Sequence, residues 1–427
     1  MLTRRQLGAL GLGGALGGLL RPRRGLAAAP VTDRKFLFVY CVGGWDPTVV
    51  FAPKVGLDSI DVDPLGTASH IGGIDFLDAA SRPAVRTFLD AYADRTCVLN
   101  GFEVRSVTHE RCRRILLTGS SGADADDWPS IVAGSPSRSE GGYLLPHLVL
   151  SGPSYTSTFG DAAVRVGSSG QLGQLLDATA FARADVPLVG LPASVNERVA
   201  ARVRARVDTM AVGAAAGRER EFLDAYGAAL DQAVRVDAIA GEVDLVPRGA
   251  NGCVDVSDTL GPALACLERG YSRSAIVQHG GFCDLGWDSH SDIEMQGTHF
   301  ELLFQDLATL MAELDARTGP GGGRLADEVT VVVLSEMGRT PKLNGAGGKD
   351  HWTYTSAMLI GAGVAGGRVI GGYDDVFVGE PVDLASGELD ADGTPLTSAH
   401  LGATLLALAD VDPAAFTTAE PIGGALG

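Results

Sequence analysis

The six cysteines of this 427-residue chain include no C-x-x-C pair. This absence argues against a zinc ribbon and a thioredoxin-type redox site, because both need two closely spaced thiols. Cys41 and Cys97 lie inside apolar, strand-like runs, which predicts buried thiols. An oxidising compartment would permit a disulfide, for which Cys253 and Cys266 are the candidates.

Beyond residue 29 the chain has no run of 18 unbroken apolar residues, the length that indicates a membrane-spanning helix. Basic residues are also scarce, because 34 lysines and arginines stand against 52 aspartates and glutamates, for a formal charge of −18. Residues 1–29 contain five arginines and no acid, so their removal takes the charge to −23. We therefore expect a soluble mature protein that binds neither nucleic acid nor anionic lipid non-specifically.

The N-terminus carries the features of an export signal. Arg4 and Arg5 precede an apolar stretch of 14 residues, Leu7 to Leu20. That stretch is shorter than the roughly 20 residues that span a bilayer. A basic segment at 21–24 and three alanines at 27–29 follow it. This order predicts a twin-arginine signal peptide, rather than a helix of the folded domain, and hence a periplasmic or secreted protein.

Apolar strands alternate with helical patterns along the rest of the chain. The pattern predicts strands at 35–42, 96–99, 144–150, 274–278, 328–334 and 356–360, and helices at 84–93, 109–117, 257–269, 296–317 and 401–408. Continuous apolar strands separated by helices favour an α/β fold with three layers, in which helices cover both faces of a mainly parallel sheet. We expect one domain over residues 30–427, with a helical insertion around 195–245.

Acidic and histidine side chains follow three of the predicted strands, either directly or in the next loop: Asp46, Asp288, His290, Glu336, Asp350 and His351. Because parallel strands end at one edge of a sheet, and ligands bind there in open α/β sheets, we expect these side chains to gather. Carboxylates together with histidines suit a divalent ion such as zinc or manganese.

Each of these residues also has a structural interpretation. An aspartate after a strand is more often a helix N-cap or a turn residue. Glu336 and Arg339 are spaced so that they could form an ion pair that holds a loop. His299 lies on the border between the polar and apolar faces of its helix, which favours a structural role. The interpretation as a binding site therefore depends on the whole set of residues, because they follow the ends of several predicted strands and not of one strand alone.

The motifs at 43–46, 287–290, 335–340, 348–352 and 361–367 occur in an order that resembles one known family. It is the exported bacterial family catalogued as domain of unknown function 1501. That family is similar to the alkaline phosphatase and sulfatase superfamily. The resemblance implies an alkaline phosphatase-like fold with metal ligands at the strand ends, holding zinc, manganese or calcium.

The superfamily pattern can be placed on this chain residue by residue. It implies that Asp288, His290 and His351 hold one ion, with Asp350 beside them. Asp46 and Glu336 would hold a second ion. Met337 stands where that second site would have a histidine, and a thioether is a poor ligand for these ions. The resemblance thus implies a reduced metal site.

The resemblance also implies a nucleophile just before a helix that ends in Thr-Gly. Ser106 and Thr108 precede such a helix here, and Thr108 suits an N-cap equally well. If the protein is an enzyme of this kind, we expect Arg339 or Arg113 to pair with the tetrahedral anion. The sulfatase signature Cys-x-Pro-x-Arg is absent, since residue 134 is glycine where a similar segment would have its nucleophile. A formylglycine sulfatase is therefore disfavoured.

Two functions remain open from the sequence. The first is an exported metal-dependent hydrolase of phosphate or related esters, acting on a small-molecule ester. The second is a non-catalytic secreted protein that keeps the fold and binds an envelope polymer. Metal content and a panel of phosphate esters distinguish the two.

Overall fold

The computed structural model describes residues 32–135, 142–160, 162–166, 193–214, 217–240, 243, 256–282 and 285–427. The predicted signal peptide at residues 1–29 lies outside these residues, as does Cys253. The predicted Cys253–Cys266 pairing therefore also falls outside the described residues, and Cys266 itself is buried. Cys41 and Cys97 are buried free thiols, as predicted.

An eight-stranded sheet forms the centre of the structure, with the strand order β12-β4-β11-β8-β1-β7-β5-β6. Its strands are β1 (Lys35–Cys41), β4 (Thr96–Glu103), β5 (His147–Val149), β6 (Ala163–Arg165), β7 (Ser274–His279), β8 (Val329–Ser335), β11 (Tyr354–Gly361) and β12 (Arg368–Ile370). β11 runs antiparallel to both of its neighbours, β4 and β8. The remaining neighbours are parallel. The prediction of a mainly parallel sheet is confirmed.

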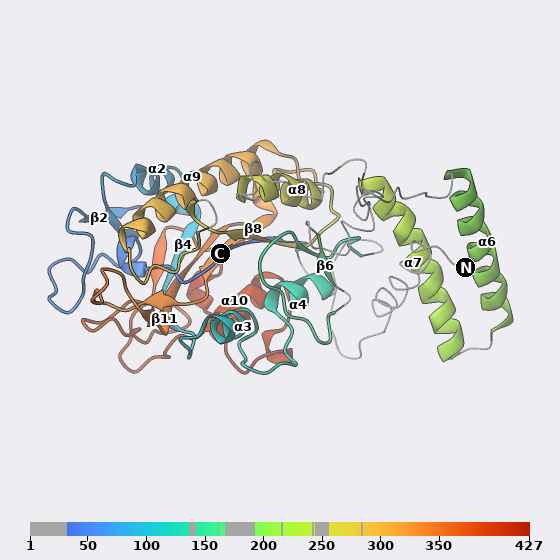
Figure 1. Cartoon of the computed structure of the whole chain (residues 1–427). Helices are drawn as coiled ribbons and strands as arrows, with labels where there is room; N and C mark the ends of the chain where they lie inside the picture. The colour runs from blue at the N-terminus through green and yellow to red at the C-terminus, as the bar shows by residue number, and fades with distance from the viewer. Residues whose placement is uncertain are drawn as a thin grey trace.

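Helices cover both faces of this sheet (Figure 1). One face carries α2 (Pro83–Tyr92), α8 (Val256–Glu268) and α9 (Glu294–Ala316). The opposite face carries α3 (His109–Thr118), α4 (Trp128–Gly134) and α10 (Ser398–Leu408). The predicted three-layer α/β fold is therefore confirmed.

The alternation of side chains along β1 explains the two helical layers. Leu37, Val39 and Cys41 belong to the apolar cluster under α2, α8 and α9. Phe36, Phe38 and Tyr40 belong to the cluster under α3, α4 and α10. Every residue of β1 is buried, as a central strand with both faces covered requires.

The reversed direction of β11 places a further segment at the functional edge of the sheet. The parallel strands β1, β4, β7 and β8 all end at one edge, and the antiparallel β11 begins there. The segment just before β11 is β10 (His351–Trp352), which pairs with β9 (Gly338–Arg339) directly after β8. His351 thereby reaches the strand ends from the opposite chain direction.

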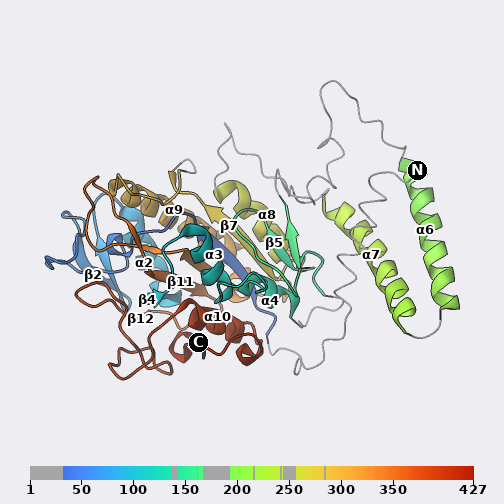
Figure 2. The same cartoon turned by 60° about the horizontal axis from the view of Figure 1, so that its bottom comes forward.

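Several elements were not predicted, or were predicted with different bounds. The helical insertion expected around 195–245 contains two helices, α6 (Ala193–Gly213) and α7 (Arg218–Ala240), which lie side by side (Figure 2). The hairpin of β2 (Thr67–Ile71) and β3 (Ile74–Asp78) was missed, because its first strand is largely exposed and lacks an apolar run. Short 3₁₀ helices are η2 (Pro47–Val49), η3 (Ala93–Arg95), η6 (Leu325–Asp327), η7 (Pro413–Ala415) and η8 (Gly423–Ala425). None of the described helices is both long enough and apolar enough to cross a bilayer.

Candidate metal centre

Three ligand atoms converge where the parallel strands end. His109, Asp288 and His351 each direct one ligand atom into a group whose members all lie within 4.8 Å of one another. His109 Nε2 is 3.3 Å from Asp288 Oδ2, and His351 Nε2 is 3.2 Å from Asp288 Oδ1. Ligand bonds of about 2.0–2.2 Å in a tetrahedral zinc site imply similar separations of about 3.3–3.5 Å. The donor set and its spacing therefore fit a divalent ion.

His109 was not among the predicted site residues. It is the first residue of α3 and follows β4 by six positions. Its sequence neighbours Ser106 and Thr108 were considered as nucleophiles, while His109 was assigned only to the helix. The signal that could have found it is the one used elsewhere, namely a histidine a few residues after the end of a buried strand.

Both histidines of the group are oriented from behind by an oxygen acceptor. His109 Nδ1 lies 3.1 Å from Glu336 Oε1, and His351 Nδ1 lies 2.7 Å from the carbonyl oxygen of Val107. Each contact holds the ring with its Nε2 atom toward Asp288. Metal-binding histidines commonly use such a partner on the outer nitrogen, which fixes both tautomer and ring orientation.

His290 extends the group in the same manner. Its Nε2 atom lies 3.1 Å from Asp288 Oδ1 and 2.9 Å from His351 Nε2. Its Nδ1 atom lies 3.0 Å from Asp350 Oδ1, and Asn344 also donates to that oxygen. We refer to His109, Asp288, His290 and His351 as the His–Asp cluster. Asp350 lies behind His290 and does not face the centre of the cluster.

Asp288 is held in place by Arg339. The Nη2 atom of Arg339 donates to Asp288 Oδ1 at 2.7 Å, while its Nε donates to the carbonyl oxygen of Gly44 at 2.8 Å. Further contacts of this guanidinium go to the carbonyl oxygens of Gly43, Trp287 and Lys349. Arg339 is fully buried and its contacts position the loops around Asp288. Of the two arginines considered as partners of a substrate anion, Arg339 and Arg113, it is therefore the less accessible.

Glu336 is likewise behind the cluster and fully buried. It accepts hydrogen bonds from the hydroxyl of Tyr40 at 2.8 Å and from the backbone N–H of Gly43 at 2.8 Å. Arg113 Nε lies 3.4 Å from the carboxylate. Burial acts to raise the pKa of Glu336, but these contacts and that of His109 outweigh it and lower the pKa. The ionised carboxylate is therefore a fixed partner for His109.

The affinity of the His–Asp cluster for an ion depends on the protonation states of its side chains. The hydrogen bond to Glu336 raises the pKa of His109. Burial raises the pKa of Asp288, but hydrogen bonds from Arg339 and His351 and the charge on Arg339 lower it overall. Metal ligands must be deprotonated, so an ion would compete with protons for His109, and its binding would strengthen as pH rises.

The carboxylate of Asp46 forms an ion pair with Lys349 and contacts no member of the His–Asp cluster among the described residues. Its Oδ2 atom lies 2.8 Å from the ammonium of Lys349, and both side chains are almost fully buried. Lys349 also donates to the hydroxyl of Thr48 and to the carbonyl oxygen of Asp61, each at 2.8 Å. Asp46 Oδ1 accepts from the Thr48 backbone and caps η2. The structural interpretation of this aspartate therefore describes its contacts, because its carboxylate pairs with the Lys349 ammonium and makes no contact with Glu336, the other residue that the resemblance assigned to a second metal ion.

The proposed nucleophiles lie beside the cluster without bonding to it. Ser106 Oγ is 3.4 Å from Thr108 Oγ1 and accepts from the Thr108 backbone at 3.3 Å. Thr108 is the N-cap residue of α3 but makes no side-chain cap bond. In the described structure neither hydroxyl hydrogen-bonds a member of the His–Asp cluster. Arg113 is 27% exposed beside Glu336, which leaves it open to an incoming anion.

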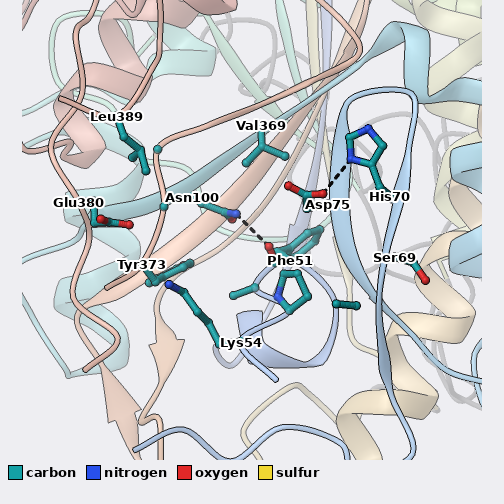
Figure 3. Close-up of a pocket in the computed structure, with 15 residues that line it drawn as sticks. Phe51, Lys54, Ser69, His70, Asp75, Asn100, Val369, Tyr373, Glu380 and Leu389 are labelled. Carbon is teal, nitrogen blue, oxygen red and sulfur yellow. Dashed lines mark hydrogen bonds and ion pairs between the residues drawn. The ribbon is translucent and has the colours of Figure 1, made fainter. Parts of the chain in front are cut away.

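A pocket lies between the β2–β3 hairpin and the segment before α10. It has a volume of about 450 Å³, and its wall includes Lys54, His70, Asp75, Asn100 and Tyr373 (Figure 3). His70 Nδ1 lies 2.8 Å from Asp75 Oδ1, and Asn100 donates to the carbonyl oxygen of Phe51 at 2.9 Å. None of the predicted site residues lines this pocket, so it does not belong to the cluster.

Comparison with known proteins bears on the C-terminal part of the chain. Residues 263–421 match the family described as Protein of unknown function (DUF1501). This is the family that the ordered motifs indicated. The matched segment contains Asp288, His290, Glu336 and His351, whereas His109 precedes it. No curated protein matches the chain.

Several solved structures resemble this chain over most of its length. A protein of the alkaline phosphatase superfamily from Vibrio parahaemolyticus is 10% identical, with 96% of this chain and 76% of that chain covered and a TM-score of 0.38. Phosphonate monoester hydrolase of Agrobacterium radiobacter is 13% identical, with 88% and 74% covered and a TM-score of 0.31. A third is Ps i-CgsB in complex with k-i-k-neocarrahexaose, 11% identical, with 90% and 72% covered and a TM-score of 0.37. At these TM-scores the fold assignment depends on the sheet topology of this chain.

Proposed function

We propose that this protein is an exported metal-dependent hydrolase of phosphate or related esters, with one divalent ion in the His–Asp cluster. The convergence of His109, Asp288 and His351 within 4.8 Å carries the proposal. The acceptors behind the two histidines support it, because they hold the rings ready for a ligand instead of leaving them free to rotate. The Asp46–Lys349 ion pair supports a single ion over two.

The donor set also supports an assignment of the ion. Calcium and magnesium prefer oxygen ligands, whereas imidazole suits zinc and other transition metals. Two histidine nitrogens, with a third nearby on His290, make the cluster nitrogen-rich. We therefore place zinc first and manganese second.

Each residue of the site has a separate role in the proposed reaction. The ion would polarise an ester oxygen and lower the pKa of an attacking hydroxyl or water. Arg113 would pair with the anionic ester, because its guanidinium is partly exposed and lies next to the cluster. Glu336 holds His109 from behind and is itself held by the hydroxyl of Tyr40. The side chains that could attack the ester are those of Ser106 and Thr108, which lie just before His109 in sequence. A water molecule is the alternative nucleophile.

Metal content is the first test. The mature protein, purified after export, is expected to hold about one zinc or manganese ion per chain by elemental analysis, and the variants His351→Ala and Asp288→Ala are expected to lose it. His70→Ala is the matched control, because His70 also contacts an aspartate but lies outside the cluster. Circular dichroism and thermal unfolding confirm that each variant is folded.

Turnover is the second test. A panel of phosphate monoesters and diesters is assayed with the metal-loaded protein, before and after chelation. Hydrolysis that the chelator abolishes and that Arg113→Gln weakens supports the proposal. A metal-loaded protein without turnover would instead support the alternative, a secreted binding protein for an envelope polymer. A folded protein that never retains an ion contradicts the metal centre itself.

Export is proposed on the N-terminal sequence alone. Replacement of Arg4 and Arg5 by lysines is expected to leave the protein in the cytoplasm, since paired arginines direct the twin-arginine route. Cell fractionation of the wild type and the variant measures this. Unchanged export of the variant would contradict the assignment of the route.

A further inference from the structure

The helical pair of α6 and α7 lies at one side of the molecule, with α7 between α6 and the central sheet (Figures 1 and 2). One face of α6 packs on α7, because Val207 is buried and an added Cβ on Gly227 would lie 4.0 Å from the side chain of Val207. On the same side, Arg204 donates to the carbonyl oxygen of Gly227 at 2.9 Å and pairs with Asp231. The opposite face of α6 therefore points away from α7 and from the central sheet.

That outer face carries a row of three arginines, Arg198, Arg202 and Arg206. They are four residues apart, so they follow one face of the helix with a rise of about 6 Å from each to the next. All three residues are exposed. Arg198 donates to the carbonyl oxygen of Ser194, and none of the three forms an ion pair within 4.0 Å among the described residues.

The sequence around this arginine row leaves it without acidic neighbours. No aspartate or glutamate lies three or four positions from any of its members, where a helical partner would be. Other arginines of the pair have such partners, since Arg204 pairs with Asp208 and Arg220 with Asp224. Like charges four residues apart destabilise a helix. In a chain with a formal charge of −18, an unpaired row of cations indicates an anionic partner.

The surroundings of the arginine row favour a chain-like partner over a membrane. A helix that lies on a membrane inserts its apolar face among the lipids, whereas the apolar face of α6 is covered by α7. The residues beside the row on the outer face are Ala201, Ala205 and Thr209, which offer no large apolar side chain. The arginines form a single file, which fits an extended chain laid along the helix.

The spacing of the arginine row also restricts the density of charge on the partner. Phosphates of one nucleic-acid strand come about every 3.4 Å, so about half of them would find no arginine in a row with a rise of about 6 Å. The unpaired phosphates would then face an acidic protein, which repels them. A polysaccharide with one charged group on each sugar places a whole ring between successive charges, which suits the wider spacing.

We propose that the outer face of α6 binds an anionic polysaccharide that carries one charged group on each sugar. Each guanidinium of the arginine row pairs with one charged group, because its fork of donors matches two oxygens of an anion. The row is a local exception to the acidic charge of the chain. This surface involves no residue of the His–Asp cluster, so the proposal holds whether or not the cluster hydrolyses esters.

Fluorescence anisotropy with labelled polygalacturonate, which has one carboxylate on each sugar, tests the surface on the full mature protein. Uncharged dextran, densely charged polyphosphate and vesicles of phosphatidylglycerol are the comparison set. The triple variant Arg198→Gln/Arg202→Gln/Arg206→Gln is expected to weaken binding of polygalacturonate about tenfold or more at low salt. Its plot of log affinity against log salt should be shallower by about 2, since each contact with a flexible polyanion contributes about 0.7.

A matched control removes the same charge from exposed positions outside α6. The triple variant Arg111→Gln/Arg235→Gln/Arg324→Gln is expected to bind polygalacturonate within about twofold of the wild type, because it leaves the arginine row intact. Circular dichroism checks that both triple variants are folded, since glutamine forms helices about as well as arginine.

A single variant reverses the charge at the centre of the row without weakening the helix. Arg202→Glu lies four residues from both Arg198 and Arg206, so it brings an acid next to two arginines at helical spacing. It is expected to unfold at a temperature at or above that of the wild type. It is nevertheless expected to abolish binding of polygalacturonate, which a loss of structure would not explain.

The outcomes are distinct. Binding that both α6 variants weaken and the control does not supports the proposal. Polyphosphate or the vesicles binding as tightly as polygalacturonate contradicts the assigned partner. Equal weakening by the control, or no binding of polygalacturonate at about 1 mM, overturns the surface itself.

Discussion

Glu336 Oε1 lies 3.1 Å from His109 Nδ1, joining the end of β8 to the start of α3 across 227 positions of sequence. The carboxylate is fully buried and reaches this position because β8 ends one residue before it. It turns the other ring nitrogen of His109 toward Asp288. The contact therefore connects the core of the fold to the proposed metal centre.

Replacing Glu336 by glutamine tests this connection. The variant is expected to lower zinc affinity about 10–100-fold, because an outer partner that orients a ligand histidine contributes that much. Competition with a chromogenic chelator measures the affinity. Glu110→Gln serves as the control, since Glu110 is exposed on the same helix and pairs with Arg113. Equal affinities for the two variants would contradict the role of Glu336.

The Asp46–Lys349 pair is expected to stabilise the fold and not to bind metal. Lys349→Met leaves the Asp46 carboxylate buried without its cation, so the free energy of unfolding should fall by about 3–5 kcal/mol. The double variant Asp46→Asn/Lys349→Met should recover most of that loss. Urea unfolding measures stability, and elemental analysis should find the metal content of the double variant unchanged. Loss of the ion in the double variant would reassign Asp46 as a ligand.

The buried His147 predicts a specific loss of stability in acid. Burial lowers the pKa of His147 to about 4, from an ordinary value of about 6.5 when unfolded. Because the folded pKa is the lower one, the unfolded state takes up the proton first. Stability is thus intact above pH 6.5 and falls as the pH drops toward 4, by about 3 kcal/mol for this group.

Urea unfolding of His147→Leu between pH 7 and pH 4 measures this contribution. The variant should lose less stability over that range than the wild type does. His70→Leu is the control, because His70 is exposed and its replacement removes no buried imidazole. Parallel curves for the wild type and His147→Leu would show that His147 does not set the acid response.

Because α10 packs closely against Trp128, we expect that replacing a glycine of this helix by alanine destabilises the protein. A Cβ on Gly402 would lie 2.1 Å from Trp128 Cε2, which the indole cannot accommodate without moving. Gly402→Ala is therefore expected to destabilise the protein by about 1–3 kcal/mol, although alanine is the better helix former. In α7, Gly227→Ala has its nearest contact at 4.0 Å and should stabilise by about 0.5–1 kcal/mol. Thermal unfolding compares the two.

The strongly apolar elements were predicted correctly because one local pattern decides each of them. β1 and β8 are buried on both faces and appear in the sequence as continuous apolar runs. α9 repeats its apolar residues at helical spacing, and its bounds lie within two residues of the prediction. The β2–β3 hairpin has no such pattern, because its strands pair with each other at the periphery of the sheet.

The candidate site was predicted in part, and the differences have a common cause. Asp288, His290 and His351 do come together, while Glu336 and Asp350 lie behind histidines and Asp46 faces Lys349. Residue type and place after a strand were known in advance. Which carboxylate faces the ion and which orients a ring depends on side-chain direction, and that follows from packing.

The sequence by itself determined the strands, the covering helices, the acidic charge and the edge of the sheet where histidines and carboxylates collect, since these follow from local periodicity and composition. Only the tertiary structure decided that β11 is reversed, which delivers His351 to that edge. It also decided that His109 joins the cluster and that Lys349 neutralises Asp46. These three facts depend on contacts between segments up to about 300 residues apart, which no local pattern specifies.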